Sequence, residues 1–271
     1  MTFKNDTDHF DQHFLIDDDI INKLLETANL KPSDIVVEIG PGKGNISKLI
    51  AKKIKKLYCI EIDRKLEPFL TDLQIKYSNV EVIYGNALNV DYPVCNKIIT
   101  SLPYSIIEPL MPKFIANKCK EIIMIVGKKF ADNVSDSQTT RLSLLTNSYY
   151  KLERIMDIAP NSFNPPPRVM SSLIKLTFLK EEEIVSLTNL LFRYLFYYED
   201  KKLKNALMES LIKIYELRHN KRLTQKESKE IVSSLDIEPN ILDKTFMTLS
   251  NEELGILFKK IDGIKEVTNI F

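Results

Sequence analysis

The chain has 271 residues and is poor in the residue types that build metal sites and disulfide frameworks, with 3 cysteines, 3 histidines and no tryptophan. The cysteines are odd in number and far apart, at Cys59, Cys95 and Cys119. This pattern is typical of reduced core residues. The histidines are equally scattered, at His9, His13 and His219. The sequence therefore predicts no disulfide and no bound metal.

Long apolar runs are also missing. No run approaches the roughly 20 residues that a membrane-spanning helix needs, and the polar segment from Met1 to Asp11 lacks the apolar centre of a signal peptide. The formal net charge is only +1, so any RNA contact would depend on a local basic patch. With 44% hydrophobic residues, the composition is that of an ordinary globular protein. We expect a soluble, cytoplasmic protein that does not contact a membrane.

A short glycine-rich segment is the clearest motif. Val36 to Gly44 reads VVEIGPGKG, a strand-like run that breaks into Gly40, Gly42 and Gly44. Glycine lacks a Cβ and tolerates positive φ, so this backbone can pass close to a ligand, and the helix that follows presents free N–H groups. The spacing G-x-G-x-G differs from the dinucleotide fingerprint G-x-G-x-x-G. We interpret the segment as a strand, a cofactor loop and a helix that would bind a nucleotide-like ligand.

A second strand-like run, Lys56 to Asp63, ends in acidic residues. Glu61 follows the glycines by about twenty residues, where a doubly wound sheet brings a carboxylate to a ribose. Glu61 is therefore the expected acceptor for two ribose hydroxyls. The alternative is that Glu61 and Asp63 only solvate the end of a strand.

Strand-like and helix-like runs alternate along the first half of the chain, which predicts βαβ units and a largely parallel sheet. Strands are expected over 35–40, 57–63, 80–88, 97–104 and 121–130, and helices over 18–29, 46–53, 66–77 and 107–117. Asp17 or Asp18 is the expected N-cap of the first helix. The segments 149–159 and 171–179 would close the sheet as an antiparallel pair around the proline-rich loop 160–167. Ligands are expected at the carboxyl edge of the sheet.

From Glu181 onward the sequence has only helical periodicities. Helices are expected over 184–197, 201–217, 224–235 and 250–260. We therefore place a domain boundary near Lys180. The predicted fold is an α/β domain over residues 1–180 and a small all-helical domain over residues 181–271.

Ser101-Leu102-Pro103-Tyr104, after the fourth strand, completes an ordered set of motifs with DQHFLID, EIGPGKG, EID, GNAL and SFNPPPRV, spanning about Gln12 to Ser172. In this order the chain resembles the small-subunit rRNA adenine N6,N6-dimethyltransferase family. The resemblance implies a Rossmann-like class I methyltransferase sheet that binds S-adenosyl-L-methionine within residues 1–180. It also implies that the helical domain, residues 181–271, contacts RNA or the ribosome.

The resemblance further implies the residues of the active site. The catalytic residues would be Ser101, Leu102, Pro103, Tyr104 and Phe163. The cofactor would be bound by Gln12, His13, Leu15, Gly40, Gly42, Glu61, Ile62, Asn86, Ala87 and Ser101. Acceptors at Ser101 and the Pro103 peptide would bind the amino group of a flipped-out adenine, while Tyr104 and Phe163 stack on its ring. Positioning would then supply the catalysis. For Tyr104 and Phe163, simple core packing is the alternative.

Several positions depart from the family pattern. Ser101 stands where the family has asparagine, and Asn86 stands where it has an acidic residue. Asp11 and Thr140 replace glycines, and Glu199-Asp200-Lys201 stands where the family has a basic R-R-K run. Acidic residues at that run should oppose a phosphate contact.

The resemblance implies methylation or dimethylation of adenosine N6 atoms in small-subunit rRNA, on a pre-ribosomal particle, by a monomeric enzyme of ribosome biogenesis. Two alternatives remain open. The departures favour a non-catalytic RNA- or ribosome-binding assembly or transcription factor derived from the family. A methyltransferase for a large-subunit adenine, like the antibiotic-resistance relatives, would share the cofactor half, although the proline loop and the helical tail favour the small-subunit group.

Overall fold

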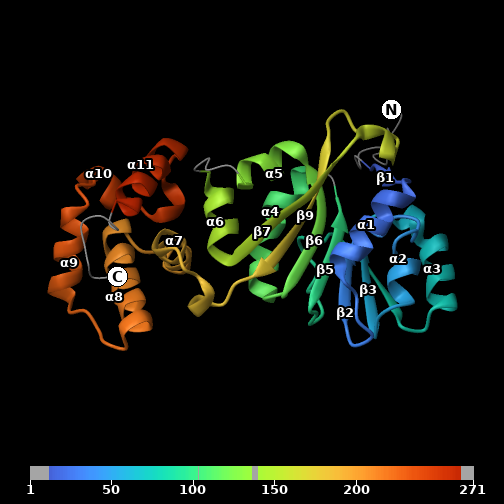
Figure 1. Cartoon of the computed structure of the whole chain (residues 1–271), viewed down its shortest axis with the longest axis horizontal. Helices are drawn as coiled ribbons and strands as arrows, with labels where there is room; N and C mark the ends of the chain where they lie inside the picture. The colour runs from blue at the N-terminus through green and yellow to red at the C-terminus, as the bar shows by residue number, and fades with distance from the viewer. Residues whose placement is uncertain (1–11, 103, 136–139, 264–271) are drawn as a thin grey trace, which may run out of the picture. The chain divides into compact units, whose positions relative to one another are not determined.

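The computed structural model describes residues 12–102, 104–135 and 140–263 (Figure 1). The chain divides into two compact units. The first contains residues 1–132 and 152–178, and the second contains residues 133–151 and 179–271. Each unit has a hydrophobic core of its own.

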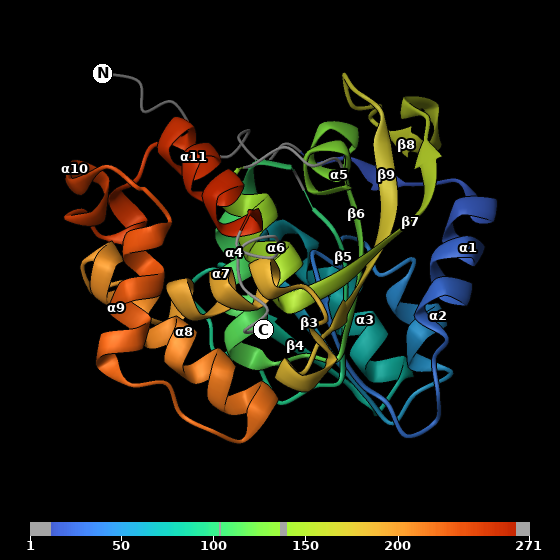
Figure 2. The ribbon, with the colours of Figure 1, turned by 60° about the vertical axis from the view of Figure 1, so that its left-hand side comes forward.

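The first unit is built on a seven-stranded sheet with the strand order β4-β3-β2-β5-β6-β9-β7. Its strands are β2 (Ile35–Ile39), β3 (Lys56–Glu61), β4 (Val80–Tyr84), β5 (Lys97–Ser101), β6 (Glu121–Gly127), β7 (Tyr150–Ile158) and β9 (Ser171–Phe178). The pairs from β4 to β6 are parallel, and β6 pairs antiparallel with β9. Figure 2 shows β7 and β9 side by side. The predicted parallel sheet is confirmed.

Helices cover both faces of this sheet. They are α1 (Asp18–Ala28), α2 (Ser47–Ala51), α3 (Glu67–Lys76), α4 (Tyr104–Asn117) and α5 (Lys128–Ser135). Figure 1 shows α1, α2 and α3 on one side of the sheet, with α4 and α5 on the other. The central strands are therefore buried on both faces, which explains why β6 reads as a continuous apolar run.

A small antiparallel pair joins two segments that are far apart in the sequence. β1 (Phe14–Leu15) pairs with β8 (Phe163–Asn164), so that Leu15 lies opposite Phe163. The connection continues into α1, because the Ser162 hydroxyl donates to Asp17 Oδ2 over 2.9 Å. Asp17 also accepts from the backbone N–H groups of Asp19 and Ile20, which confirms it as the N-cap. The proline-rich loop is thereby tied to the N-terminal motif.

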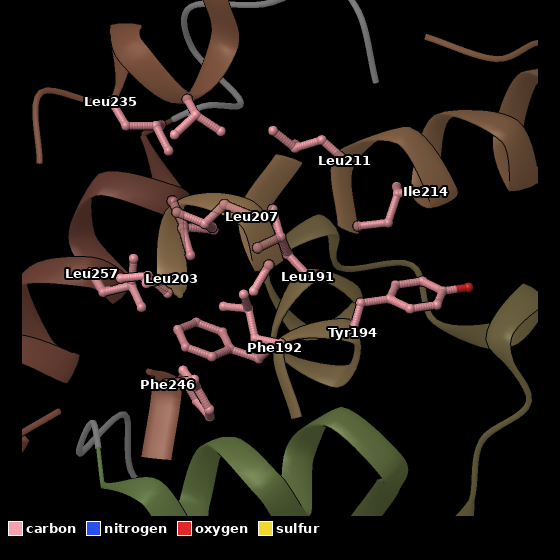
Figure 3. Close-up of a cluster of buried hydrophobic side chains, with 14 of the residues drawn as sticks. Leu191, Phe192, Tyr194, Leu203, Leu207, Leu211, Ile214, Leu235, Phe246 and Leu257 are labelled. Carbon is pink, nitrogen blue, oxygen red and sulfur yellow. The ribbon is translucent and has the colours of Figure 1, made fainter. Parts of the chain in front are cut away.

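The second unit is helical. Its elements are α6 (Arg141–Tyr149), α7 (Leu187–Tyr197), α8 (Leu203–His219), α9 (Gln225–Ser234), α10 (Pro239–Leu242) and α11 (Asn251–Asp262). Figure 3 shows its core, in which side chains such as Phe192, Leu207 and Phe246 are fully buried. Arg141 at the start of α6 donates to the carbonyls of Phe246, over 3.1 Å, and Leu249, over 2.7 Å. These bonds connect α6 to the segment that precedes α11.

Several expected bounds need correction. The strand expected over 80–88 ends at Tyr84, and the strand expected over 97–104 ends at Ser101, because Tyr104 begins α4, which was expected to start near residue 107. The strand expected over 121–130 ends at Gly127, because Lys128 begins α5. The segment 133–151, which the expected boundary near Lys180 leaves in the first domain, clusters with the second unit. The reason is that Leu144 of α6 packs in the core of the second unit. After α6 the chain forms β7 of the sheet, and it returns to the second unit at Leu179.

Candidate functional site

A cavity of about 320 Å³ opens in the first unit where β2, β3, β4 and β5 end. All of its lining residues belong to that unit. The expected site residues in its wall are Gln12, His13, Leu15, Gly40, Gly42, Glu61, Ile62, Asn86, Ala87, Ser101, Leu102 and Phe163. Tyr104 is the first residue of α4, and Pro103 lies outside the described residues. The structure thus gathers in one place residues that are up to 151 positions apart, from Gln12 to Phe163.

The glycine loop adopts the predicted left-handed backbone. Gly40, Gly42 and Gly44 have φ values of +71°, +58° and +77°. A Cβ on Gly40 would lie 2.8 Å from Leu102 Cδ2, and a Cβ on Gly42 would lie 2.9 Å from Phe14 Cε1. Neither position has room for a side chain, so the loop forms a cradle that depends on glycine.

Glu61 lines this cavity and accepts a hydrogen bond from the glycine loop. Its side chain is 4% exposed, and its two oxygens accept from the N–H groups of Gly42, over 3.3 Å, and Asp63, over 2.9 Å. Burial raises the pKa of Glu61, and these backbone hydrogen bonds oppose the shift. A backbone hydrogen bond from Ile62 also lowers its pKa, and since a carboxylate has about four acceptor positions, at least one remains for a ligand. Such burial does not fit a residue that only solvates the end of a strand.

Asp63 has a different environment from Glu61. Its Oδ1 accepts from Lys65 N over 2.9 Å, at the start of the short 3-10 helix Arg64–Leu66. Its Oδ2 accepts from Gln12 Nε2 over 3.3 Å. Asp63 therefore orders the turn after β3 and holds Gln12 at the wall of the cavity.

Glu38, the first residue of the EIGPGKG motif, is a cavity residue to which the sequence analysis assigned no role. It lies in β2 and is 3% exposed, and burial raises its pKa to about 7. The hydrogen bond from Cys59 Sγ to Glu38 Oε2, over 3.8 Å, partly offsets that shift. The available signal was an acidic residue inside an otherwise apolar, buried strand, since such a residue is rare without a role.

Asn86 follows β4 and offers a mixed set of hydrogen-bonding atoms. Its Oδ1 accepts from Leu88 N over 2.9 Å. An aspartate at this position would keep a second acceptor oxygen, whereas Asn86 has the Nδ2 donor. A ligand next to Asn86 therefore meets a donor where the family pattern would provide an acceptor.

The end of β5 brings Ser101 and Leu102 into the wall of the cavity. The Thr100 hydroxyl donates to Ile39 O over 3.1 Å, which ties the end of β5 to the end of β2. Leu102 packs against Gly40. Phe163 is 4% exposed and also lines the wall, so it is both a core residue and a cavity residue.

Sequence reasoning missed most of the apolar residues of the wall. These include Phe14, Leu24, Ile46, Ile106 and Ile125, and the wall also contains Lys43 and Thr100. The ammonium of Lys43 lies 5.8 Å from the ring centroid of Phe14 and 5.5 Å from that of Phe69. Within residues 12–102, 104–135 and 140–263, no group of three or more His, Cys, Asp or Glu side chains is arranged to hold a metal ion. None of the helices in the same ranges is long and apolar enough to cross a membrane.

Comparison with known proteins gives consistent results. The family model described as "Ribosomal RNA adenine dimethylase" matches residues 3–238. A "Probable ribosomal RNA small subunit methyltransferase A" of Pyrococcus furiosus is 31% identical over 263 residues, which cover 95% of this chain and 93% of the relative. The protein with the same description from Methanococcus aeolicus is 33% identical over 259 residues, covering 91% and 93%.

Solved structures share the fold. The crystal structure of a dimethyladenosine transferase from Plasmodium falciparum has a TM-score of 0.63 at 24% identity, with coverage of 96% of this chain and 100% of that chain. The 23S rRNA methyltransferase ErmE has a TM-score of 0.60 at 20% identity, with coverage of 92% and 99%. The first unit is thus the Rossmann-like sheet of class I methyltransferases, followed in the chain by a helical region.

Proposed function

This chain belongs to the ribosomal RNA adenine dimethylase family, and from that membership and the site we propose that it is an S-adenosyl-L-methionine-dependent enzyme that methylates N6 atoms of adenosines in small-subunit ribosomal RNA. The observation that carries the proposal is a cavity lined both by the glycine loop and Glu61 and by Ser101 and Leu102. Transfer of a methyl group requires a donor site and an acceptor site that open into each other.

The glycine cradle supports the cofactor assignment. Gly40 and Gly42 line the cavity with positive φ, and because they have no Cβ their backbone can border a bound ligand while Leu102 and Phe14 pack beside it. When bound, S-adenosyl-L-methionine supplies an electrophilic methyl group on a sulfonium sulfur. Glu61 would accept hydrogen bonds from its ribose hydroxyls, with Ile62, Asn86 and Ala87 beside it. Gln12, His13 and Leu15 would border the cofactor from the N-terminal segment.

The residues after β5 would bind the target base. An adenine amino nitrogen is a poor nucleophile because its lone pair is delocalised into the ring. Acceptors at Ser101 and in the Leu102–Pro103 backbone would take the amino N–H bonds and so localise that lone pair. Tyr104 and Phe163 would stack on the base, which is worth about 1–3 kcal/mol per base. In this proposal no side chain has to act as a general base of unusual pKa.

The substrate would be ribosomal RNA in a pre-ribosomal particle, contacted also by the second unit. The relatives described above are named as methyltransferases or as a transferase, and none of these names points to the non-catalytic alternative. We propose that the protein acts as a monomer in the cytoplasm.

The decisive experiment uses small ribosomal subunits from a strain that lacks this methylation. The protein and S-adenosyl-L-methionine are incubated with those subunits, and the rRNA is digested and analysed by mass spectrometry. We expect N6-methylated or N6,N6-dimethylated adenosine in the small-subunit RNA. Methylation of large-subunit RNA alone would favour the antibiotic-resistance type of activity. A protein that does not bind the cofactor at millimolar concentration in calorimetry would not be an enzyme of this kind.

A further inference from the structure

Lys113 lies on α4 and is not a lining residue of the cavity, yet its ammonium is bonded to the loop that forms one wall. Nζ donates to the carbonyl oxygens of Ala87, over 3.2 Å, and Leu88, over 2.9 Å, and also to that of Val90. An ammonium has three N–H groups. All of them are therefore engaged by one short stretch of backbone.

The loop that Lys113 holds supplies Gly85, Asn86 and Ala87 to the cavity wall. Several of its N–H groups are bonded within the first unit. Gly85 N donates to Glu61 O over 2.8 Å, and Asn86 O accepts from the N–H groups of Asn89 and Val90, over 2.8 and 3.0 Å. The carbonyl oxygens of Ala87, Leu88 and Val90 accept from Lys113.

The loop is also tightly packed. A Cβ on Gly85 would lie 2.6 Å from Val90 Cγ1, so the end of the loop folds back directly over its start. A shift of the carbonyl of Val90 would consequently move the wall residues next to Gly85. Lys113 donates to that carbonyl of Val90 and so opposes the shift.

Among its described contacts, the charged ammonium of Lys113 forms hydrogen bonds only with the carbonyl oxygens of this loop. In the described ranges it forms no ion pair with a carboxylate within 4.0 Å, and its other neighbour is the Tyr92 ring, with the centroid 4.9 Å from Nζ. Hydrogen bonds from a charged donor are roughly twice as strong as neutral ones. The contact therefore stabilises one conformation of the loop and does not serve a separate salt bridge.

α4 begins at Tyr104, directly after the segment that would receive the base. Lys113 is nine residues further along, about 14 Å at 1.5 Å per residue. The same helix, which contains Pro109 and Pro112, thus connects the base side of the cavity with the loop on its cofactor side.

We propose that Lys113 is a positioning residue for the cofactor, which holds Gly85, Asn86 and Ala87 in the conformation that binds S-adenosyl-L-methionine. This inference rests on the proposed function. Lys113 touches neither the cavity nor the reacting atoms, and it acts through the backbone carbonyls of the loop.

The test is the substitution Lys113→Met, which keeps an unbranched stem of similar length and removes the ammonium. We expect the dissociation constant for S-adenosylhomocysteine, measured by calorimetry, to rise about tenfold, the effect of losing one strong hydrogen bond. The KM for S-adenosyl-L-methionine should rise in parallel, while kcat at saturating cofactor changes less. Lys113→Arg should recover part of the affinity, since it keeps the charge in a planar group that fits three converging carbonyls less well. The matched control is Lys120→Met, at an exposed lysine in the same unit.

Hydrogen exchange gives a readout that does not require ligand binding. The amides of Leu88, Asn89 and Val90 should be protected in the wild-type protein and exchange faster in Lys113→Met, but not in Lys120→Met. A Lys113→Met protein that is folded, binds S-adenosylhomocysteine like wild type and keeps this protection would overturn the inference. If Lys113→Met does not fold, unprotected amides in the wild-type loop would overturn it as well. A wild-type protein that fails to bind the cofactor but shows the predicted exchange would instead contradict the proposed function.

Discussion

Replacing Gly40 with alanine tests the cradle most directly. The residue has φ +71°, and its new Cβ would lie 2.8 Å from Leu102 Cδ2 and 3.8 Å from Leu102 Cγ. The left-handed backbone costs an L-residue roughly 1–2 kcal/mol. The contact with Leu102 is relieved only if that side chain turns, and Leu102 is itself part of the cavity wall. We therefore expect Gly40→Ala to lower the free energy of unfolding by about 1–2 kcal/mol.

The same substitution should also weaken cofactor binding. A displaced Leu102 and an added methyl group both intrude on the space of the ligand. We expect the dissociation constant for S-adenosylhomocysteine to rise about tenfold or more, which corresponds to at least about 1.4 kcal/mol. Calorimetry measures the binding, and urea denaturation followed by circular dichroism measures the stability.

Gly255 provides the matched control. It lies within α11 of the second unit, and a Cβ there would meet nothing within 4 Å. Gly255→Ala should raise stability by about 0.5–1 kcal/mol, because alanine is the better helix former, and it should leave cofactor binding unchanged. If Gly40→Ala binds S-adenosylhomocysteine as wild type does and is equally stable, the cradle does not determine the site.

Three further substitutions test other parts of the cavity. Glu61→Gln should raise the dissociation constant for S-adenosylhomocysteine about tenfold, because one of the N–H groups of Gly42 and Asp63 would then face an amide donor; calorimetry with unchanged affinity would remove Glu61 from the cofactor site. Glu38 has a folded-state pKa of about 7 against an ordinary 4.5, so the unfolded chain releases its proton first and stability falls as pH rises through that window, by at most about 3 kcal/mol. Glu38→Gln should lack this loss, which urea denaturation at about pH 5 and about pH 8 would reveal, and parallel pH profiles of variant and wild type would contradict the assignment. Tyr104→Ala should lose about 1–3 kcal/mol of base stacking and slow methyl transfer without changing cofactor affinity, and undiminished turnover would exclude Tyr104 from the base site.

Local rules were sufficient for much of the fold. The alternation of runs predicted the parallel sheet, and residue type and position narrowed the N-cap of the first helix to Asp17 or Asp18, of which Asp17 is the one observed. The positive φ values of the glycine loop followed from the spacing of three glycines after an apolar strand. These features depend on neighbouring residues, which a sequence shows directly.

Features that depend on distant residues were not predictable in this way. The pairing of Leu15 with Phe163 and the contacts of Lys113 with the loop after β4 join segments that no local pattern relates. The burial of Glu38 depends on the packing of both faces of the sheet. The end of β6 at Gly127 was also missed, since Lys128, Lys129 and Phe130 carry no strong stop signal for a strand.

The chain passes between the two units more than once, leaving the first after residue 132, returning at residue 152 and leaving again after residue 178. A single proteolytic cut therefore cannot release either unit intact. A fragment that stops at Phe178 would carry α6 without the helices that bury Leu144 and without the carbonyls that bind Arg141. During synthesis on the ribosome, the sheet cannot be completed before β9 has emerged, and α6 cannot be packed before the helices after Leu179 have emerged. Neither unit is therefore complete until most of the polypeptide has been made.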